Sequence, residues 1–154
     1  MTAHFNQYIL LADDDGDDQE LLKESILQYY PAALIKTVNS GPQVLAWLEE
    51  CSDEQLPAIL ILDYKMPILN AAQVLDELNA NARYAGLPKV VWSTSSNRNH
   101  VDECLSKGAM GYFPKPNEVT ELATITESIL SLCGWNAILR SPNFLRSPNV
   151  EFLT

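Results

Sequence analysis

Short apolar runs recur along the chain, and each is followed by a segment with the spacing of an amphipathic helix. The runs cover about residues 7–12, 33–38, 58–62, 89–93 and 110–113. Continuous apolar runs of this length are typical of strands in a parallel sheet that is buried on both faces. Because strands and helices alternate five times, the sequence predicts an α/β fold, with a five-stranded, doubly wound parallel sheet and five helices.

Capping residues and helix breakers predict where the helices begin and end. We expect Asp17 or Asp18 to cap the first helix, which reaches about Tyr30 because Pro31 cannot continue it. A side chain that can accept from free backbone amides also precedes each later helix. These expected caps are Ser40, Asn70, Asn99 and Asn117.

Polar side chains stand at the carboxyl ends of four of the apolar runs. Asp13 and Asp14 close the first run, Asp63 the third and Ser93 the fourth, and Lys115 follows the fifth. Parallel strands bring their carboxyl ends to one edge of the sheet, where open α/β sheets bind ligands. We therefore expect these side chains to converge although they lie far apart in the sequence.

The residue types at this edge favour a metal-assisted phosphoryl site. Carboxylates held close together repel one another, and a hard divalent ion such as Mg²⁺ relieves that repulsion. Asp63 could attack phosphorus and form an aspartyl phosphate. Lys115 supplies a positive charge for a phosphoryl oxygen, and the Ser93 hydroxyl supplies a hydrogen-bond donor.

Length and charge narrow the classes of partner. The chain has 154 residues and a net charge of −10, which suits one domain and argues against nucleic acid or an anionic membrane surface as the partner. The three cysteines are widely spaced, as expected of reduced thiols in the cytoplasm. The start of the chain lacks the pattern of a secretion signal, and no apolar run is long enough to span a bilayer.

The last part of the chain departs from the strand–helix rhythm. Arg140-Ser141-Pro142-Asn143 recurs as Arg146-Ser147-Pro148-Asn149, and such Ser-Pro and Asn segments favour turns. The expected organisation is one domain over 1–133 and a C-terminal tail over 134–154. An extended tail is the simpler interpretation, and an arm that binds a partner or forms a weak homodimer is the alternative.

Four segments together resemble the receiver domain of bacterial two-component response regulators. They are ILLADDD at 9–15, LDYKMP at 62–67, STS at 93–95 and GAMGYFPKP at 108–116. Their order and spacing match the family over about residues 6–132, although each segment alone is a weak signal. The resemblance implies a flavodoxin-like, CheY-like sheet with strand order 2-1-3-4-5.

The resemblance also implies a role for each acid at the sheet edge. Asp63 would be the phosphoacceptor for a histidine kinase or a histidine phosphotransfer protein. Asp14, Asp63 and the backbone carbonyl of Lys65 would bind Mg²⁺ directly, and Asp13 would act through metal-bound water. Lys65 stands where many members have a small polar residue, which puts the rate of dephosphorylation in doubt.

Further implied roles concern the phosphoryl oxygens and the response to them. Ser93 and Lys115 would hold these oxygens, and Ser93 and Tyr112 would form the conformational switch. Thr94 is the alternative switch hydroxyl, and it is bulkier than the residue common at its position. The Lys115–Pro116 peptide bond resembles the family's cis bond, which would aim the lysine into the site.

Simpler interpretations stand beside these roles. The acids could cap helices or lie in loops, Lys115 could be a solvated lysine, Ser93 could bond loop backbone, and Tyr112 could be a core aromatic. The acidic run that starts at Asp13 also resembles a calcium loop, but Asp18 occupies the position that requires glycine. His4 and His100 are expected to be ordinary surface residues, and Trp92 to point into a helix layer.

The function expected from the sequence is a single-domain response regulator in the cytoplasm. Phosphorylation of Asp63 would change a surface that a downstream protein reads, and the chain would catalyse only its own phosphorylation and dephosphorylation. One alternative is a receiver-like interaction module that is never phosphorylated. Another is a phosphatase with an aspartyl nucleophile, which is disfavoured because Lys65 stands where such enzymes need a second acid.

Overall fold

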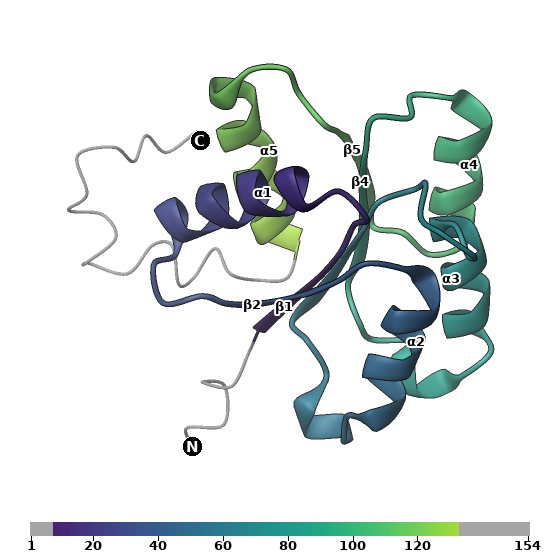
Figure 1. Cartoon of the computed structure of the whole chain (residues 1–154). Coiled ribbons are helices and arrows are strands. Elements are labelled where there is room, and N and C mark those ends of the chain that lie inside the picture. Colours follow the sequence, from purple (N-terminus) through teal and green to yellow (C-terminus); the bar gives the residue numbers. More distant parts are fainter. Residues whose placement is uncertain (1–7, 133–154) are drawn as a thin grey trace.

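The computed structural model describes residues 8–132, and within them strands and helices alternate as predicted (Figure 1). The strands form one parallel sheet in the order β2-β1-β3-β4-β5, which confirms the predicted fold and strand order. The strands are β1 (Tyr8–Ala12), β2 (Leu34–Val38), β3 (Ile59–Leu62), β4 (Lys89–Ser93) and β5 (Gly111–Pro114). The helices are α1 (Gly16–Tyr29), α2 (Gly41–Glu50), α3 (Ala71–Asn79), α4 (Arg98–Ser106) and α5 (Val119–Leu132), with short 3₁₀ helices η2 (Asp53–Gln55) and η3 (Ala82–Tyr84).

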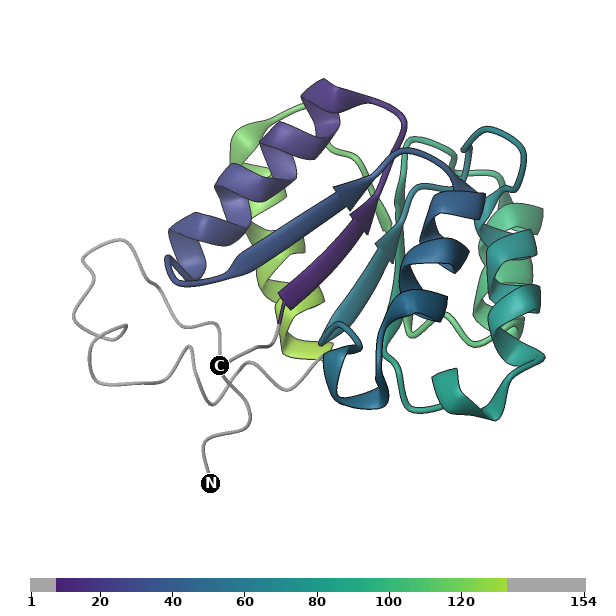
Figure 2. The ribbon, with the colours of Figure 1, turned by 60° about the horizontal axis from the view of Figure 1, so that its bottom comes forward.

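The helices cover the sheet on both faces. Helices α1 and α5 pack together on one face, and α2, α3 and α4 pack in a row on the other (Figures 1 and 2). This two-sided arrangement explains why the middle residues of β1, β3 and β4 are apolar, since helices cover both faces of these strands and bury nearly all of their residues.

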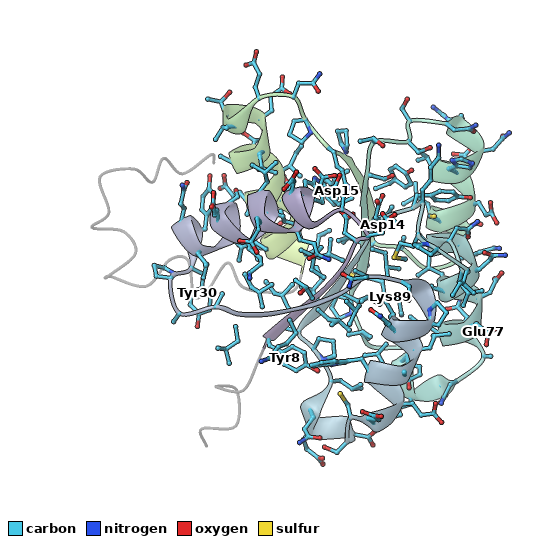
Figure 3. The ribbon with its side chains drawn as sticks, viewed as in Figure 1. Tyr8, Asp14, Asp15, Tyr30, Glu77 and Lys89 are labelled. Carbon is cyan, nitrogen blue, oxygen red and sulfur yellow. The ribbon has the colours of Figure 1, made fainter. Side chains whose placement is uncertain are left out.

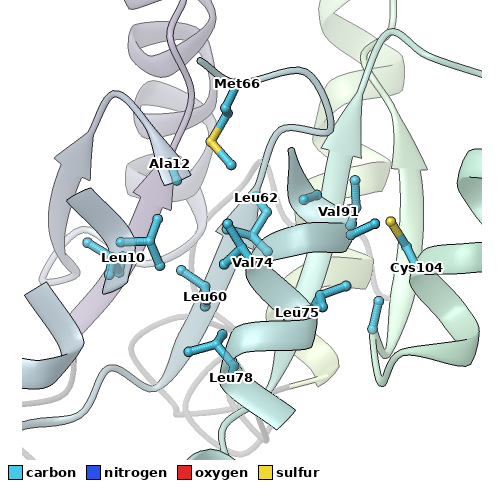
Figure 4. Packing of buried hydrophobic residues seen from close by; sticks show 14 of the residues in the cluster. Leu10, Ala12, Leu60, Leu62, Met66, Val74, Leu75, Leu78, Val91 and Cys104 are labelled. Atoms are coloured by element: carbon cyan, nitrogen blue, oxygen red, sulfur yellow. The ribbon is translucent and has the colours of Figure 1, made fainter. Parts of the chain in front are cut away.

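Alternate residues of the central strands divide between two hydrophobic clusters. Leu10 and Leu60 enter the cluster beneath α2, α3 and α4, part of which Figure 4 shows. Ile9 and Ile61 enter the cluster beneath α1 and α5, together with Trp92, which confirms that Trp92 points into a helix layer. Full burial of one such side chain stabilises the fold by roughly 1.5–3 kcal/mol. The two clusters therefore hold the strand ends in place.

Several helix caps differ from the prediction by one or two residues. Asp15 caps α1, because its side chain accepts from the amides of Asp17 and Asp18, so neither of these two residues is the cap. Asn97 caps α4 in place of Asn99. Helix α5 begins at Val119, and the carbonyl that accepts its first bond belongs to Glu118 and not to Asn117.

The predicted caps of the second and third helices are confirmed. Ser40 accepts from the Gln43 amide, and Asn70 forms a reciprocal capping box with Gln73. The three misplaced caps share a cause: the residue that caps is the one whose backbone is still extended when the helix starts, and the length of each βα loop decides that.

Two described residues adopt a left-handed backbone. Gly108 has a φ of 99° in the turn between α4 and β5, where glycine carries no steric penalty. Ile68 has a φ of 74° in the loop between β3 and α3, and its side chain is 81% exposed. A β-branched residue with this backbone is strained, so the β3–α3 loop stores conformational energy beside the sheet edge.

Some predictions fall outside the described residues. The tail over 134–154, its suggested dimer-forming role, His4 and Cys133 all lie there. Within 8–132 both cysteines, Cys51 and Cys104, are free thiols. None of the helices in that part of the chain is long and apolar enough to cross a membrane.

Candidate functional site

Three carboxylates meet where β1 and β3 end, as the topology predicted. One oxygen each from Asp13, Asp14 and Asp63 lies within 4.8 Å of the others. Asp13 is fully buried, Asp63 is nearly so, and Asp14 is exposed at the start of the β1–α1 loop (Figure 3). The amide of Asp13 donates to Val38 and that of Asp63 to Ala12, so both acids continue the hydrogen bonding of the sheet. The sheet itself therefore fixes their positions.

Lys115 joins these acids from the end of β5. Its Nζ lies 2.7 Å from Asp13 Oδ2 and 3.2 Å from Asp63 Oδ2, and its side chain is 7% exposed. Its amide donates to the Ser93 carbonyl, and its Nζ lies 5.0 Å from the centre of the Trp92 ring. The ammonium thus lies over the face of the Trp92 ring and beside the predicted phosphoacceptor.

The pKa values at the site follow from burial and from mutual charge. Burial raises the pKa of Asp13 to about 6, and the nearby charge of Asp63 adds to this, although Lys115 and the Asp15 amide oppose it. Burial alone would lower the pKa of Lys115. The Asp13 carboxylate beside the ammonium and the Asp18 carboxylate that accepts from it, with the charge of Asp63, raise this pKa above its usual value instead. The pocket therefore carries more negative charge than one lysine neutralises.

The residues present fit a divalent cation. All three donors are hard carboxylate oxygens, the ligand type that Mg²⁺ and Mn²⁺ prefer. Asp13 Oδ2 is buried, and it contacts Lys115 without a well-directed hydrogen bond, so it keeps capacity for a further partner. Lys65 lies two residues beyond Asp63 with an exposed side chain, and its backbone carbonyl stays a predicted ligand.

Ser93 and Tyr112 are linked through the loop that follows β4. The Ser93 hydroxyl is buried and accepts from the Ser95 amide at 3.2 Å. The Tyr112 hydroxyl donates to the Ser95 carbonyl at 2.7 Å, and burial raises the pKa of this tyrosine. Thr94 is exposed, whereas Ser93 is buried at the end of β4. The switch roles themselves stay predictions.

His100 has specific contacts, and the expectation of an ordinary surface residue is wrong. Its Nδ1 lies 2.7 Å from Ser95 Oγ, and its ring stacks on Tyr64 with centroids 3.9 Å apart and an interplanar angle of 13°. Tyr64 follows Asp63 directly, so His100 connects α4 to the residue beside the predicted phosphoacceptor. No periodicity in the sequence signals this contact, because it joins two loops through helix packing.

The structure corrects one implied feature and adds one residue. No peptide bond within residues 8–132 is cis, so the Lys115–Pro116 bond is trans and that expectation is wrong. Asp18 lies 2.8 Å from Lys115 Nζ, although the sequence suggested only a capping role for it. The sequence held one indication of this contact. Asp17 and Asp18 are adjacent acids, and because a helix has one N-cap residue, at least one of them had to have another role.

Comparison with known proteins agrees with this geometry. Residues 9–127 match the family described as response regulator receiver domain. The chain is 25% identical over 122 residues to two-component response regulator ORR12 of Oryza sativa subsp. japonica. The aligned part covers 79% of this chain and 97% of that protein.

Two solved structures share the fold. The phosphorylated cyanobacterial phytochrome response regulator RcpA superposes with a TM-score of 0.75 at 24% identity, over 88% of this chain and 99% of that one. The Mn²⁺-bound form of response regulator Rcp1 superposes with a TM-score of 0.71 at 23% identity, over 81% of this chain and 92% of that one. The family match over residues 9–127 spans all three site acids and Lys115. This chain belongs to the response regulator receiver family.

Proposed function

We propose that Asp63 accepts a phosphoryl group from a histidine kinase or a histidine phosphotransfer protein, and that the chain signals as a single-domain response regulator. The observation that carries this proposal is the cluster of Asp13, Asp14, Asp63 and Lys115 at the carboxyl edge of the sheet. Family membership supports phosphoryl acceptance on an aspartate. We assign this function to the domain predicted over 1–133.

The transfer needs an oxygen nucleophile and a leaving nitrogen. An oxygen of Asp63 forms a bond to phosphorus, and the P–N bond of the donor phosphohistidine breaks. The electron pair of that bond goes to the imidazole nitrogen, and one proton, carried by the ring beforehand or taken from solvent, makes the leaving imidazole neutral. Asp14 is exposed, so at least one carboxylate of the cluster is accessible to a donor protein.

The metal and Lys115 share the added charge. Asp14, Asp63 and the Lys65 carbonyl would hold Mg²⁺, with Asp13 acting through bound water. When bound, the cation neutralises charge on the transferring phosphoryl group. The Lys115 ammonium, 3.2 Å from Asp63 Oδ2, already lies where it would pair with a phosphoryl oxygen. The receiver thus catalyses only its own phosphorylation and dephosphorylation.

The switch would run through the loop after β4. The Ser93 hydroxyl accepts from the Ser95 amide and keeps its own O–H for a phosphoryl oxygen. If the hydroxyl moves toward that oxygen, the Ser95 amide has to follow or lose its acceptor, and this disturbs the Tyr112 and His100 contacts on the same residue. The surface of α4, β5 and α5 then changes shape, and a downstream protein reads it. The free thiols Cys51 and Cys104 suit a reducing compartment such as the cytoplasm.

Intact mass spectrometry tests the proposal. With Mg²⁺ and acetyl phosphate, the wild-type protein should gain the mass of one phosphoryl group, and Asp63→Asn should gain none. Asp102→Asn, which removes an exposed acid from α4, is the matched control and should be labelled like the wild type. An unlabelled wild type, or equal labelling of Asp63→Asn, would overturn the proposal.

Mg²⁺ binding separates phosphorylation from a purely structural role. A cation that binds only the folded protein should stabilise it by about 2.7 kcal/mol at 100 times its Kd. A receiver-like module that is never phosphorylated would show no change in melting temperature with Mg²⁺. Asp14→Asn should remove the change in a chain whose site works as proposed.

A further inference from the structure

Asp18 contributes a third carboxylate to the surroundings of Lys115, beside those of Asp13 and Asp63. It lies in the first turn of α1, and its Oδ2 is 2.8 Å from Lys115 Nζ, closer than the Asp63 oxygen at 3.2 Å. The two residues are 97 positions apart, so the contact is a product of the fold. Asp15 already caps α1, which leaves the Asp18 side chain without a capping task.

The ammonium has three N–H donors, and three carboxylates surround it. Asp13, Asp18 and Asp63 each lie within 3.2 Å of Lys115 Nζ. Of these, Asp13 and Asp63 belong to the acidic cluster that fits a cation, whereas Asp18 does not. When a cation occupies the cluster, Asp18 is the carboxylate that remains free to hold Lys115.

A phosphoryl group on Asp63 would bring new negative charge to the same ammonium. Asp18 then opposes it in two ways: it shares the Lys115 donors, and its own charge repels the phosphoryl oxygens. Both effects have the same sign. Asp18 is side by side with the exposed Asp17 in the helix, so helix-end electrostatics do not distinguish the two acids, but only Asp18 contacts Lys115.

We propose that Asp18 is a positioning residue that retains Lys115 and thereby lowers the affinity of the site for a phosphoryl group. This inference rests on the proposed function. In this arrangement the strength of phosphoryl binding depends on how far Lys115 leaves Asp18, and a single carboxylate outside the metal cluster sets that balance.

The test compares two charge-removing variants of the same helical turn. Asp18→Asn keeps an oxygen that can accept from Lys115 but removes the charge, and Asp17→Asn removes an equal charge one residue away. Beryllofluoride, which mimics a phosphoryl group, is titrated at saturating Mg²⁺ for each variant. Mg²⁺ alone is titrated separately, with calorimetry as the readout in both cases.

The two titrations should move in opposite directions for Asp18→Asn. Its affinity for beryllofluoride should rise by about three- to tenfold, as expected for the loss of one partly solvated charge. Its affinity for Mg²⁺ should fall, because the pocket is less negative and Lys115 pairs more strongly with Asp13 and Asp63. Asp17→Asn should change neither by more than about twofold, and Asp18→Glu should stay near the wild type.

A damaged fold cannot imitate this result, because it would weaken both affinities. Asp18→Asn that binds beryllofluoride no better than Asp17→Asn, or more weakly than the wild type, overturns the role of Asp18. Failure of the proposed function looks different: the wild-type protein itself would then bind neither Mg²⁺ nor beryllofluoride.

Discussion

The two edges of the sheet each bury a lysine, and the two lysines have opposite surroundings. Lys89 begins β4 at the amino edge, is 5% exposed, and donates to the carbonyl of Tyr84 at 2.9 Å. Burial lowers its pKa. Lys115 follows β5 at the carboxyl edge among three carboxylates, which raise its pKa. One ammonium donates to a neutral carbonyl, and the other lies among three carboxylates.

Other groups at the two edges differ in the same way. At the amino edge, the Tyr8 hydroxyl accepts from Trp47 Nε1 and donates to the Gln55 carbonyl, so neutral partners satisfy it. At the carboxyl edge, burial keeps the pKa of Asp13 high in spite of its contact with Lys115. The amino edge is arranged for stability, whereas the carboxyl edge keeps an excess of negative charge that a cation can relieve.

Replacing each lysine by methionine tests this difference most strongly. Lys115→Met leaves buried carboxylates without their counter-charge and should lower the free energy of unfolding by about 3 kcal/mol without metal. Lys89→Met removes a buried ammonium that has a neutral partner, so it should change stability by less than about 1 kcal/mol. Urea unfolding at pH 7.5 measures both. Equal losses would remove the distinction between the edges.

The pH dependence of stability tests the charge excess directly. Because the pKa of Asp13 is raised to about 6, the folded protein binds a proton that the unfolded chain has already lost. Stability should therefore fall as the pH rises from about 4 to 6. Asp13→Asn should remove most of this slope and stabilise the metal-free protein at pH 7.5 by ~2–3 kcal/mol. Saturating Mg²⁺ should also flatten the wild-type slope.

The left-handed residues extend the comparison to the backbone. Ile68→Asn, at the carboxyl edge, should raise the free energy of unfolding by about 1 kcal/mol, because asparagine tolerates a positive φ that isoleucine does not. Gly108→Ala, at the amino edge, should lower it by a similar amount, about 1 kcal/mol. Thermal unfolding of the two variants measures the pair. A loss of stability in Ile68→Asn would show that its exposed side chain stabilises the loop.

A neutral change at the amino edge should have the smallest effect on the site. Tyr8→Phe removes the hydroxyl that joins Trp47 to Gln55 and should cost about 1 kcal/mol. The site lies at the other end of β1, so the Mg²⁺ Kd and the rate of labelling by acetyl phosphate should stay at their wild-type values. A change in either would mean that the two edges are coupled through the strand.

The sequence was sufficient for the sheet and for the meeting of Asp13, Asp14, Asp63 and Lys115. Apolar runs define the strands, and the topology of parallel sheets brings their carboxyl ends together without any knowledge of side-chain packing. Contacts between helices and loops were not predictable in this way. Asp18 meets Lys115 because α1 packs at one particular rotation, and neither helical periodicity nor charge patterning fixes that rotation.

Local backbone geometry limited the remaining predictions. The caps Asp15 and Asn97 depend on where the chain stops being extended, and a shift of one or two residues leaves the sequence pattern almost unchanged. The isomer of the Lys115–Pro116 bond came only from resemblance, and the structure differs. The contacts of His100 were not predictable, because its partners, Ser95 and Tyr64, lie in loops whose conformations have no periodic pattern in the sequence.

Ser95 holds three separate segments with three different groups. Its amide bonds Ser93, its carbonyl receives Tyr112, and its hydroxyl contacts His100. A shift of this one residue must release a strand end, an aromatic ring and a helix at the same moment. The three contacts of the loop after β4 are therefore expected to break together. The surface formed by α4 and β5 should then have two conformations, with few molecules in intermediate ones.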